Sequence, residues 1–147
     1  MNEHALRATA HALVARDKGL LAMDESTGTC NKRFAGAGIP QTEHARRAYR
    51  EMLVTTPDLA SCISGAILYD ETIRQKTTGG TLFVKVLTAA GIIPGFKVDL
   101  GARPLAGQPV ERIPERPDGL RPRPQDYRQS CAHFPTCPPL HLSGPAL

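Results

Sequence analysis

The chain has no tryptophan, and aromatic residues make up only 5% of its 147 positions. Proteins that stack nucleic-acid bases place aromatic side chains among basic ones, and no such stripe occurs in this sequence. The net charge of +4 is modest, and we interpret it as a solvated surface together with an arginine-rich carboxyl-terminal segment. We therefore expect no nucleic-acid partner.

Cysteine is scarce, and long apolar runs are missing. The few cysteines are irregularly spaced, which argues against a disulfide framework and favours reduced thiols: Cys30, Cys62, Cys131 and Cys137. No apolar run approaches the length that crosses a bilayer. Residues 1–18 have the pattern of an amphipathic helix rather than of a secretory signal. We therefore predict a cytoplasmic protein with no membrane partner.

Proline is rare in the first part of the chain and dense in the second. Three prolines precede residue 103, whereas ten follow it. Because proline lacks a backbone donor and blocks helix interiors, this density argues against regular structure. We divide the chain into an ordered part, residues 1–107, and a Pro/Arg-rich tail, residues 108–147, for which we expect irregular or disordered chain.

Residues 1–107 alternate between helical patterns and short apolar strands. We expect helices at residues 3–17 and 81–89, a turn or short helix at 28–34, and a helix that Thr42 caps and that runs to about Val54. The expected strands span residues 20–23, 66–69 and 92–98. This alternation indicates an α/β fold with a parallel sheet and right-handed crossovers, and three strands are too few to close a barrel.

Charged residues follow each expected strand. The pairs are Asp24 with Glu25, Asp70 with Glu71, and Lys97 with Asp99. Because the carboxyl ends of parallel strands meet at one rim, we expect these groups to converge. For Asp70 and Glu71 we give equal weight to a simpler role, in which they cap the next helix.

Several blocks of the sequence resemble class I fructose-bisphosphate aldolase, in that family's order and spacing. They are the run Leu21-Ala22-Met23-Asp24-Glu25-Ser26-Thr27-Gly28-Thr29 and residues 32–33, 46–51, 63–72, 91–99 and 104–107. The similarity covers most of residues 5–107, fades through about residue 129 and is not visible beyond it. It implies an incomplete TIM (β/α)8 barrel with about three of the eight strands, followed by an irregular tail.

The resemblance also implies roles for individual residues. Asp24 matches a catalytic aspartate that assists Schiff-base chemistry and carbon–carbon cleavage. The residues that match substrate contacts are Ser26, Thr29, Arg33, Arg46 and Lys97. The implied glycolytic reaction is the reversible cleavage of fructose 1,6-bisphosphate to glyceraldehyde 3-phosphate and dihydroxyacetone phosphate, without a metal or other cofactor. The family is usually homo-oligomeric.

The sequence departs from the family pattern in its second part. The Leu-Leu-Lys-Pro-Asn segment that carries the Schiff-base lysine and the Glu-Pro-Glu acid/base segment do not occur in it. Thr136 stands where the family has another active-site lysine, and we expect Pro135 and Pro138 to break that strand. We therefore predict that this polypeptide alone is inactive. The alternative role is non-catalytic phosphosugar binding or subunit association.

The tail itself invites two further interpretations. Its change in composition after Gln129 is what a frameshift, a truncated gene or a gene-prediction error would produce. It also contains residue types that bind zinc: Cys131, His133, Cys137 and His141. Their spacing does not match the usual paired ligands, and the neighbouring prolines restrict the loop, so we expect no metal site.

Overall fold

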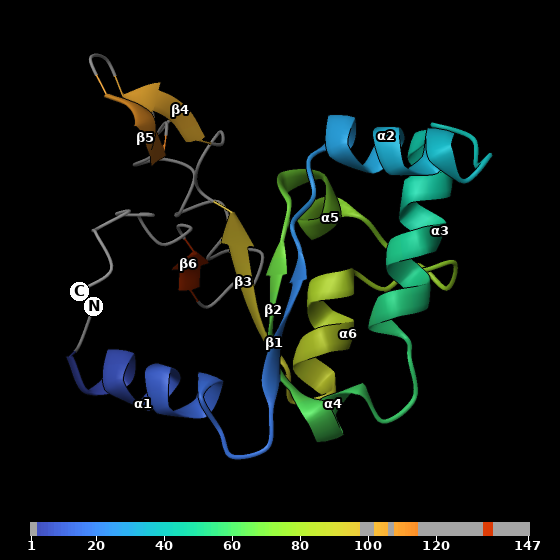
Figure 1. Cartoon of the computed structure of the whole chain (residues 1–147). Helices are drawn as coiled ribbons and strands as arrows, with labels where there is room; N and C mark the ends of the chain where they lie inside the picture. Colours follow the sequence, from blue (N-terminus) through green and yellow to red (C-terminus); the bar gives the residue numbers. More distant parts are fainter. Residues whose placement is uncertain (1–2, 98–101, 106–107, 115–133, 137–147) are drawn as a thin grey trace.

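The computed structural model describes residues 3–97, 102–105, 108–114 and 134–136. Its central feature is a parallel sheet in the strand order β1-β2-β3-β6 (Figure 1). The strands are β1 (Gly19–Met23), β2 (Ile63–Leu68), β3 (Ile93–Lys97) and β6 (Phe134–Thr136). The register pairs Met23 with Leu68 and Leu68 with Phe96, so the carboxyl ends of β1, β2 and β3 are level with one another.

Helices cover one face of this sheet, and in Figure 1 α3, α5 and α6 stand together on that side. The helices are α1 (Glu3–Leu13), α2 (Thr27–Gly36), α3 (Glu43–Val54), α4 (Leu59–Cys62), α5 (Asp70–Arg74) and α6 (Phe83–Ala89). As the sequence predicts, the Thr42 hydroxyl caps α3 by accepting the Ala45 N–H at 3.2 Å. None of the described helices is long and apolar enough to cross a membrane.

The hydrophobic core lies between the sheet and these helices. Alternate strand residues point to the helical side, and those of the central strands are fully buried. The core comprises Met23, Val54, Ala66, Leu68, Ile73, Phe83, Val84, Leu87, Ile92 and Phe96. Through this core the helices pack as one layer on the sheet. A segment of a (β/α)8 barrel has the same arrangement.

The end of α1 is fastened to the start of β2. The Ser64 hydroxyl is close to two backbone carbonyls, those of Leu13 at 2.6 Å and Gly19 at 3.2 Å. A Cβ added at Gly65 would lie 2.5 Å from Leu13 Cδ2 and 3.0 Å from Leu20 Cδ2, so both leucine side chains would have to move to make room for it. The helix ends at Leu13 rather than near residue 17, because the chain turns there and Asp17 adopts a φ of 63°.

The three predicted strands are confirmed, and the described sheet contains a fourth, β6. Its register on β3 pairs Phe96 with Pro135 and Lys97 with Thr136. The expectation that Pro135 breaks this strand is wrong. It is the outermost strand of the described sheet, where pairing uses only one side of the backbone, so a missing N–H is tolerated.

A second, two-stranded antiparallel sheet joins β4 (Ala102–Leu105) and β5 (Gln108–Pro114). Two strands, β5 and β6, therefore lie within residues 108–147, and the expectation of a tail without regular structure does not hold for them. Both strands tolerate proline because neither has strand neighbours on two sides in the described sheets. β5 belongs to a two-stranded sheet, and β6 is the outermost strand of the four-stranded one. The remainder of the tail, including Cys131, His133, Cys137 and His141, lies outside the described residues.

Candidate functional site

A carboxylate and an ammonium group meet at the carboxyl edge of the sheet. Asp24 directly follows β1, and Lys97 is the last residue of β3, with β2 between them. The Lys97 Nζ donates to Asp24 Oδ2 at 3.3 Å, and the side chains are 22% and 28% exposed. The structure thus brings together two predicted site residues that lie 73 positions apart, and both side chains are partly exposed.

Ser26 and Thr29 form the next part of this edge, at the amino-terminal end of α2. Ser26 is the N-cap, and its Oγ accepts the Thr29 N–H at 3.3 Å and lies 3.0 Å from Thr29 Oγ1. The Cys30 N–H bonds to the Ser26 carbonyl at 2.9 Å. Two hydroxyls therefore sit beside the N–H groups and positive dipole end of a helix, which is an environment that favours an anion.

Arg33 lies one turn further along α2 and is paired with Glu25. Its Nη1 is 2.5 Å from Glu25 Oε1, and the Arg33 side chain is 64% exposed whereas that of Glu25 is 15% exposed. The second carboxylate after β1 therefore pairs with an exposed guanidinium of the same helix that carries Thr29. An anion bound there would share this guanidinium with Glu25.

Arg46 lies behind this edge rather than on it. It is 6% exposed, and four of its five N–H donors are taken up. Glu71 accepts from Nε at 3.0 Å and from Nη2 at 2.8 Å, and Asn31 Oδ1 accepts from Nη1 at 2.9 Å. Hydrogen bonding to Glu71 raises the pKa of Arg46. The structure places Arg46 in a framework of protein groups.

The same framework contains Arg50, which sequence reasoning missed. Arg50 is 1% exposed and donates to Glu71, to Gln75 Oε1 at 3.1 Å and to the Glu25 carbonyl at 3.4 Å. The bonds from Arg46 and Arg50 hold the pKa of Glu71 below its ordinary value, against the effect of burial. A signal was present: Arg46, Arg50 and Val54 recur every four residues and form the buried stripe of α3.

Asp70 and Glu71 both occupy the first turn of α5, but its N-cap is Tyr69, which makes no side-chain capping hydrogen bond, so the capping interpretation is wrong. Asp70 pairs with Arg74 one turn on, at 3.2 Å. Acidic side chains are favourable at this position because they face the positive end of the helix dipole. Glu71 has the additional structural role of joining α5 to the two buried arginines of α3.

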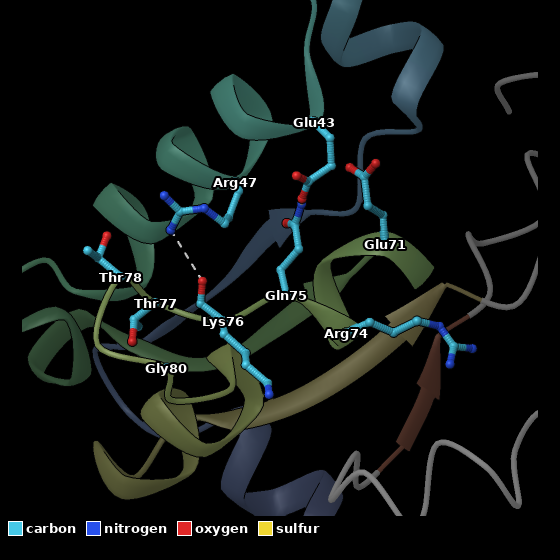
Figure 2. Close-up of a pocket in the computed structure, with 9 residues that line it drawn as sticks. All are labelled: Glu43, Arg47, Glu71, Arg74, Gln75, Lys76, Thr77, Thr78 and Gly80. Atoms are coloured by element: carbon cyan, nitrogen blue, oxygen red, sulfur yellow. Dashed lines mark hydrogen bonds between the residues drawn. The ribbon is translucent and has the colours of Figure 1, made fainter.

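A pocket of about 700 Å³ opens on the outer side of α3 and α5 (Figure 2). None of the residues predicted to contact substrate or to act in catalysis lines it, although Glu71 does. Its lining consists of Glu43, Arg47, Glu71, Arg74, Gln75, Lys76, Thr77, Thr78 and Gly80. Figure 2 shows Gln75 reaching Glu43, and its Nε2 donates to Glu43 Oε1 at 2.6 Å. The lining has three basic and two acidic side chains, and Arg47, Glu71 and Arg74 are already in ion pairs, so it favours no charged ligand class.

Two features bear on metal binding and on the cysteines. Within the described ranges there is no group of three or more His, Cys, Asp or Glu side chains arranged to hold a metal ion. Cys30 and Cys62 are free thiols, and burial raises the pKa of Cys30. The thiol of Cys30 therefore behaves as a small core side chain under α2.

Comparison with known proteins gives one consistent result. The family model for fructose-bisphosphate aldolase class-I matches residues 5–137. This range extends beyond residue 129, where we expected the similarity to stop. The chain is 57% identical over 134 residues to a probable fructose-bisphosphate aldolase class 1 of Xanthomonas campestris pv. campestris. It is 46% identical over 126 residues to the chloroplastic fructose-bisphosphate aldolase 3 of Arabidopsis thaliana.

A solved structure shares the fold as well as the sequence. The fructose-bisphosphate aldolase of Plasmodium falciparum, solved in complex with TRAP and a small-molecule inhibitor, superposes with a TM-score of 0.84 at 40% identity. The match covers 90% of this chain and 38% of that one. The chain likewise covers 40% of the Xanthomonas relative and 32% of the Arabidopsis one, although 91% and 86% of its own residues are matched.

Proposed function

The chain belongs to the class I fructose-bisphosphate aldolase family, and from this we propose that it forms one phosphosugar-binding corner of an aldolase active site. The proposed reaction is the reversible cleavage of fructose 1,6-bisphosphate into glyceraldehyde 3-phosphate and dihydroxyacetone phosphate. The observation that carries the proposal is the Asp24–Lys97 pair, 3.3 Å apart at the ends of two strands and next to the amino-terminal end of α2.

Asp24 and Lys97 are the groups that we assign to the reacting part of the sugar. In a Schiff-base mechanism a lysine amine attacks the ketone, and the resulting iminium ion accepts the electron pair of the carbon–carbon bond that breaks. Asp24 would exchange a proton with the sugar during these steps, and Lys97 would hold a substrate oxygen. Neither role needs a metal or an organic cofactor.

Ser26, Thr29 and Arg33 are the groups that we assign to a phosphate of the substrate. The two hydroxyls and the N–H groups at the start of α2, which the helix itself does not use, supply hydrogen-bond donors, and the helix dipole adds a partial positive charge. Arg33 adds a full charge with a planar pair of donors. Glu25, the ion-pair partner of Arg33, would share this guanidinium with the phosphate.

The polypeptide of 147 residues does not contain the segment that carries the Schiff-base lysine in the family. The register places the backbone of Thr136 beside Lys97, at the rim where the family pattern has another lysine. We therefore propose that this polypeptide alone binds a phosphosugar without cleaving it. The cytoplasm is the compartment we propose, because the described cysteines are free thiols.

The test is a titration of the isotope-labelled polypeptide with dihydroxyacetone phosphate, followed by amide NMR. We expect the largest shifts at the amides of residues 26–29 and at Lys97, and their loss in a Lys97→Met variant. Lys85→Met is the matched control, because Lys85 is an exposed residue of α6 within the same chain. Shifts confined to the Figure 2 pocket, or no shifts at all, would contradict the proposal.

A second candidate function is association with another polypeptide through the sheet face opposite the helices. Leu20, on that face of β1, is 48% exposed, and Val14 beyond the end of α1 is 76% exposed. Exposed apolar groups and strand edges favour association. Analytical ultracentrifugation over a hundredfold range of concentration tests this function, because a constant monomer mass would exclude self-association.

A further inference from the structure

We propose that Arg46 and Arg50, joined by Glu71, form a clamp that positions the turn at residues 25–31. We call this unit the arginine clamp. The inference rests on the proposed function, because it assigns that turn to the substrate phosphate. It adds a role for three side chains that do not contact the phosphate. They hold in place the backbone of residues 25–31, which carries the groups that would bind it.

The arginine clamp contacts the turn at both of its ends. Arg50 Nη2 donates to the Glu25 carbonyl at 3.4 Å, at the point where the chain leaves β1. Arg46 Nη1 donates to Asn31 Oδ1 at 2.9 Å, one turn into α2. Ser26 and Thr29 lie between these two points, so their hydroxyls are carried by a segment that is held on either side.

The clamp is held rigidly because its charges are buried and paired. Arg50 is 1% exposed and Arg46 6% exposed, and the Glu71 carboxylate bonds to both guanidinium groups. Moving either arginine would leave a buried charge without its partner, which is costly in a low-dielectric environment. The two arginines and one glutamate also leave a net charge of +1 behind the turn, which adds to the attraction for an anion.

Arg47 is also an arginine of α3, but it does not belong to the arginine clamp. Arg47 pairs with Glu51 at 2.5 Å and donates to the Lys76 carbonyl at 3.3 Å, on the pocket side of α3 (Figure 2). It therefore fastens α3 to the loop after α5 and not to residues 25–31. Arg47→Met is the control variant for the loss of one arginine from α3.

The experiment measures amide hydrogen exchange and binding in Arg50→Met, Arg47→Met and the unmodified polypeptide. We expect the Thr29 and Cys30 amides to exchange about tenfold faster in Arg50→Met, because a charged hydrogen bond of the turn is lost. The Ala45 amide, which the Thr42 cap protects at the start of the same helix, should not change. Arg47→Met should leave all three amides unchanged.

A second variant covers the case in which Arg50→Met does not fold. Asn31→Ala removes only the outer contact of the clamp, on a partly exposed side chain, and we expect the same selective rise in exchange at Thr29. Equal acceleration at Ala45 and Thr29 in whichever variant folds would show general loosening and would overturn the inference.

Binding separates this inference from the proposed function. With inorganic phosphate as the probe, we expect Arg50→Met to bind at least about tenfold more weakly than the unmodified polypeptide, and Arg47→Met to bind equally well. Equal affinity in Arg50→Met would overturn the inference. If the unmodified polypeptide binds neither inorganic phosphate nor dihydroxyacetone phosphate, the proposed function fails, and the exchange data still decide whether the clamp holds the turn.

Discussion

Replacing Glu71 with glutamine should destabilise the fold strongly, because one carboxylate neutralises two buried guanidinium groups. Its Oε1 and Oε2 accept from Arg46 at 3.0 and 2.8 Å, and Oε1 also accepts from Arg50. Glutamine keeps the shape of the side chain but removes the charge and turns an amide N–H₂ toward a guanidinium. Arg46 and Arg50 would then be buried without a counter-charge.

The size of this effect follows from the burial. Removing one partner of a buried ion pair costs about 3 to 5 kcal/mol of unfolding free energy. Glu71 has a side chain 23% exposed, whereas those of Arg46 and Arg50 are 8% and 1% exposed, so solvent screens the pair only slightly. With a urea dependence of about 1.5 kcal/mol per molar, the unfolding midpoint should fall by about 2 to 3 M.

The assay is urea unfolding at pH 7 and at acid pH, with Glu51→Gln as the matched control. Glu51 also has a lowered pKa, through the Thr78 N–H, but it pairs with Arg47 outside the buried framework. The stabilisation from Glu71 is present above its ordinary pKa of 4.5 and is lost as the pH falls through its lower pKa in the folded state. The difference between Glu71→Gln and the unmodified polypeptide should therefore shrink in acid. Equal midpoints for Glu71→Gln and Glu51→Gln at pH 7 would refute the reasoning.

Four further outcomes follow from the structure. Gly65→Ala should cost about 1 to 3 kcal/mol in urea unfolding, because the new Cβ would lie 2.5 Å from Leu13 Cδ2 and the Leu13 side chain would have to repack; an unchanged midpoint would contradict this packing. Thr42→Ala should cost about 1 kcal/mol by the same assay through loss of the α3 cap, and the Ala45 amide should exchange faster. Leu87→Ala, at a fully buried core position, should cost about 3 kcal/mol, and a loss below 1 kcal/mol would argue against the core described. Borohydride treatment with dihydroxyacetone phosphate should give no stable adduct detectable by mass spectrometry, and an adduct would show that a lysine of this polypeptide forms a Schiff base.

Local patterns were enough to predict most of the fold. The Thr42 cap, the short apolar runs of β1 and β2 and the glycine at the end of α6 are signals within a few residues of the element they define, and Gly91 indeed has a φ of 79°. The short helices α4 and α5 were missed because four or five residues are too few to show a helical period. The strand β6 was missed because Pro135 argues against a strand wherever its place in the sheet is unknown.

The candidate site was only partly predictable for a related reason. Charged residues after strands indicated the rim, and the 3.3 Å contact of Asp24 with Lys97 fits that expectation. The role of Arg46 could not be predicted from the sequence. The sequence pattern around a helical arginine is the same whether its guanidinium binds a ligand or a buried glutamate. Only tertiary packing shows that Arg46 and Arg50 face Glu71.

The most direct test of the central claim is an activity measurement on a chimera. Residues 5–97 of this chain would replace the matching segment of the Xanthomonas campestris pv. campestris relative, which supplies the rest of the barrel. We expect the chimera to cleave fructose 1,6-bisphosphate, and Asp24→Asn within it to lose about 100-fold or more of the activity while Asp17→Asn loses none. A folded chimera without activity, or one that Asp24→Asn leaves unchanged, would contradict the assignment of this chain to an aldolase active site.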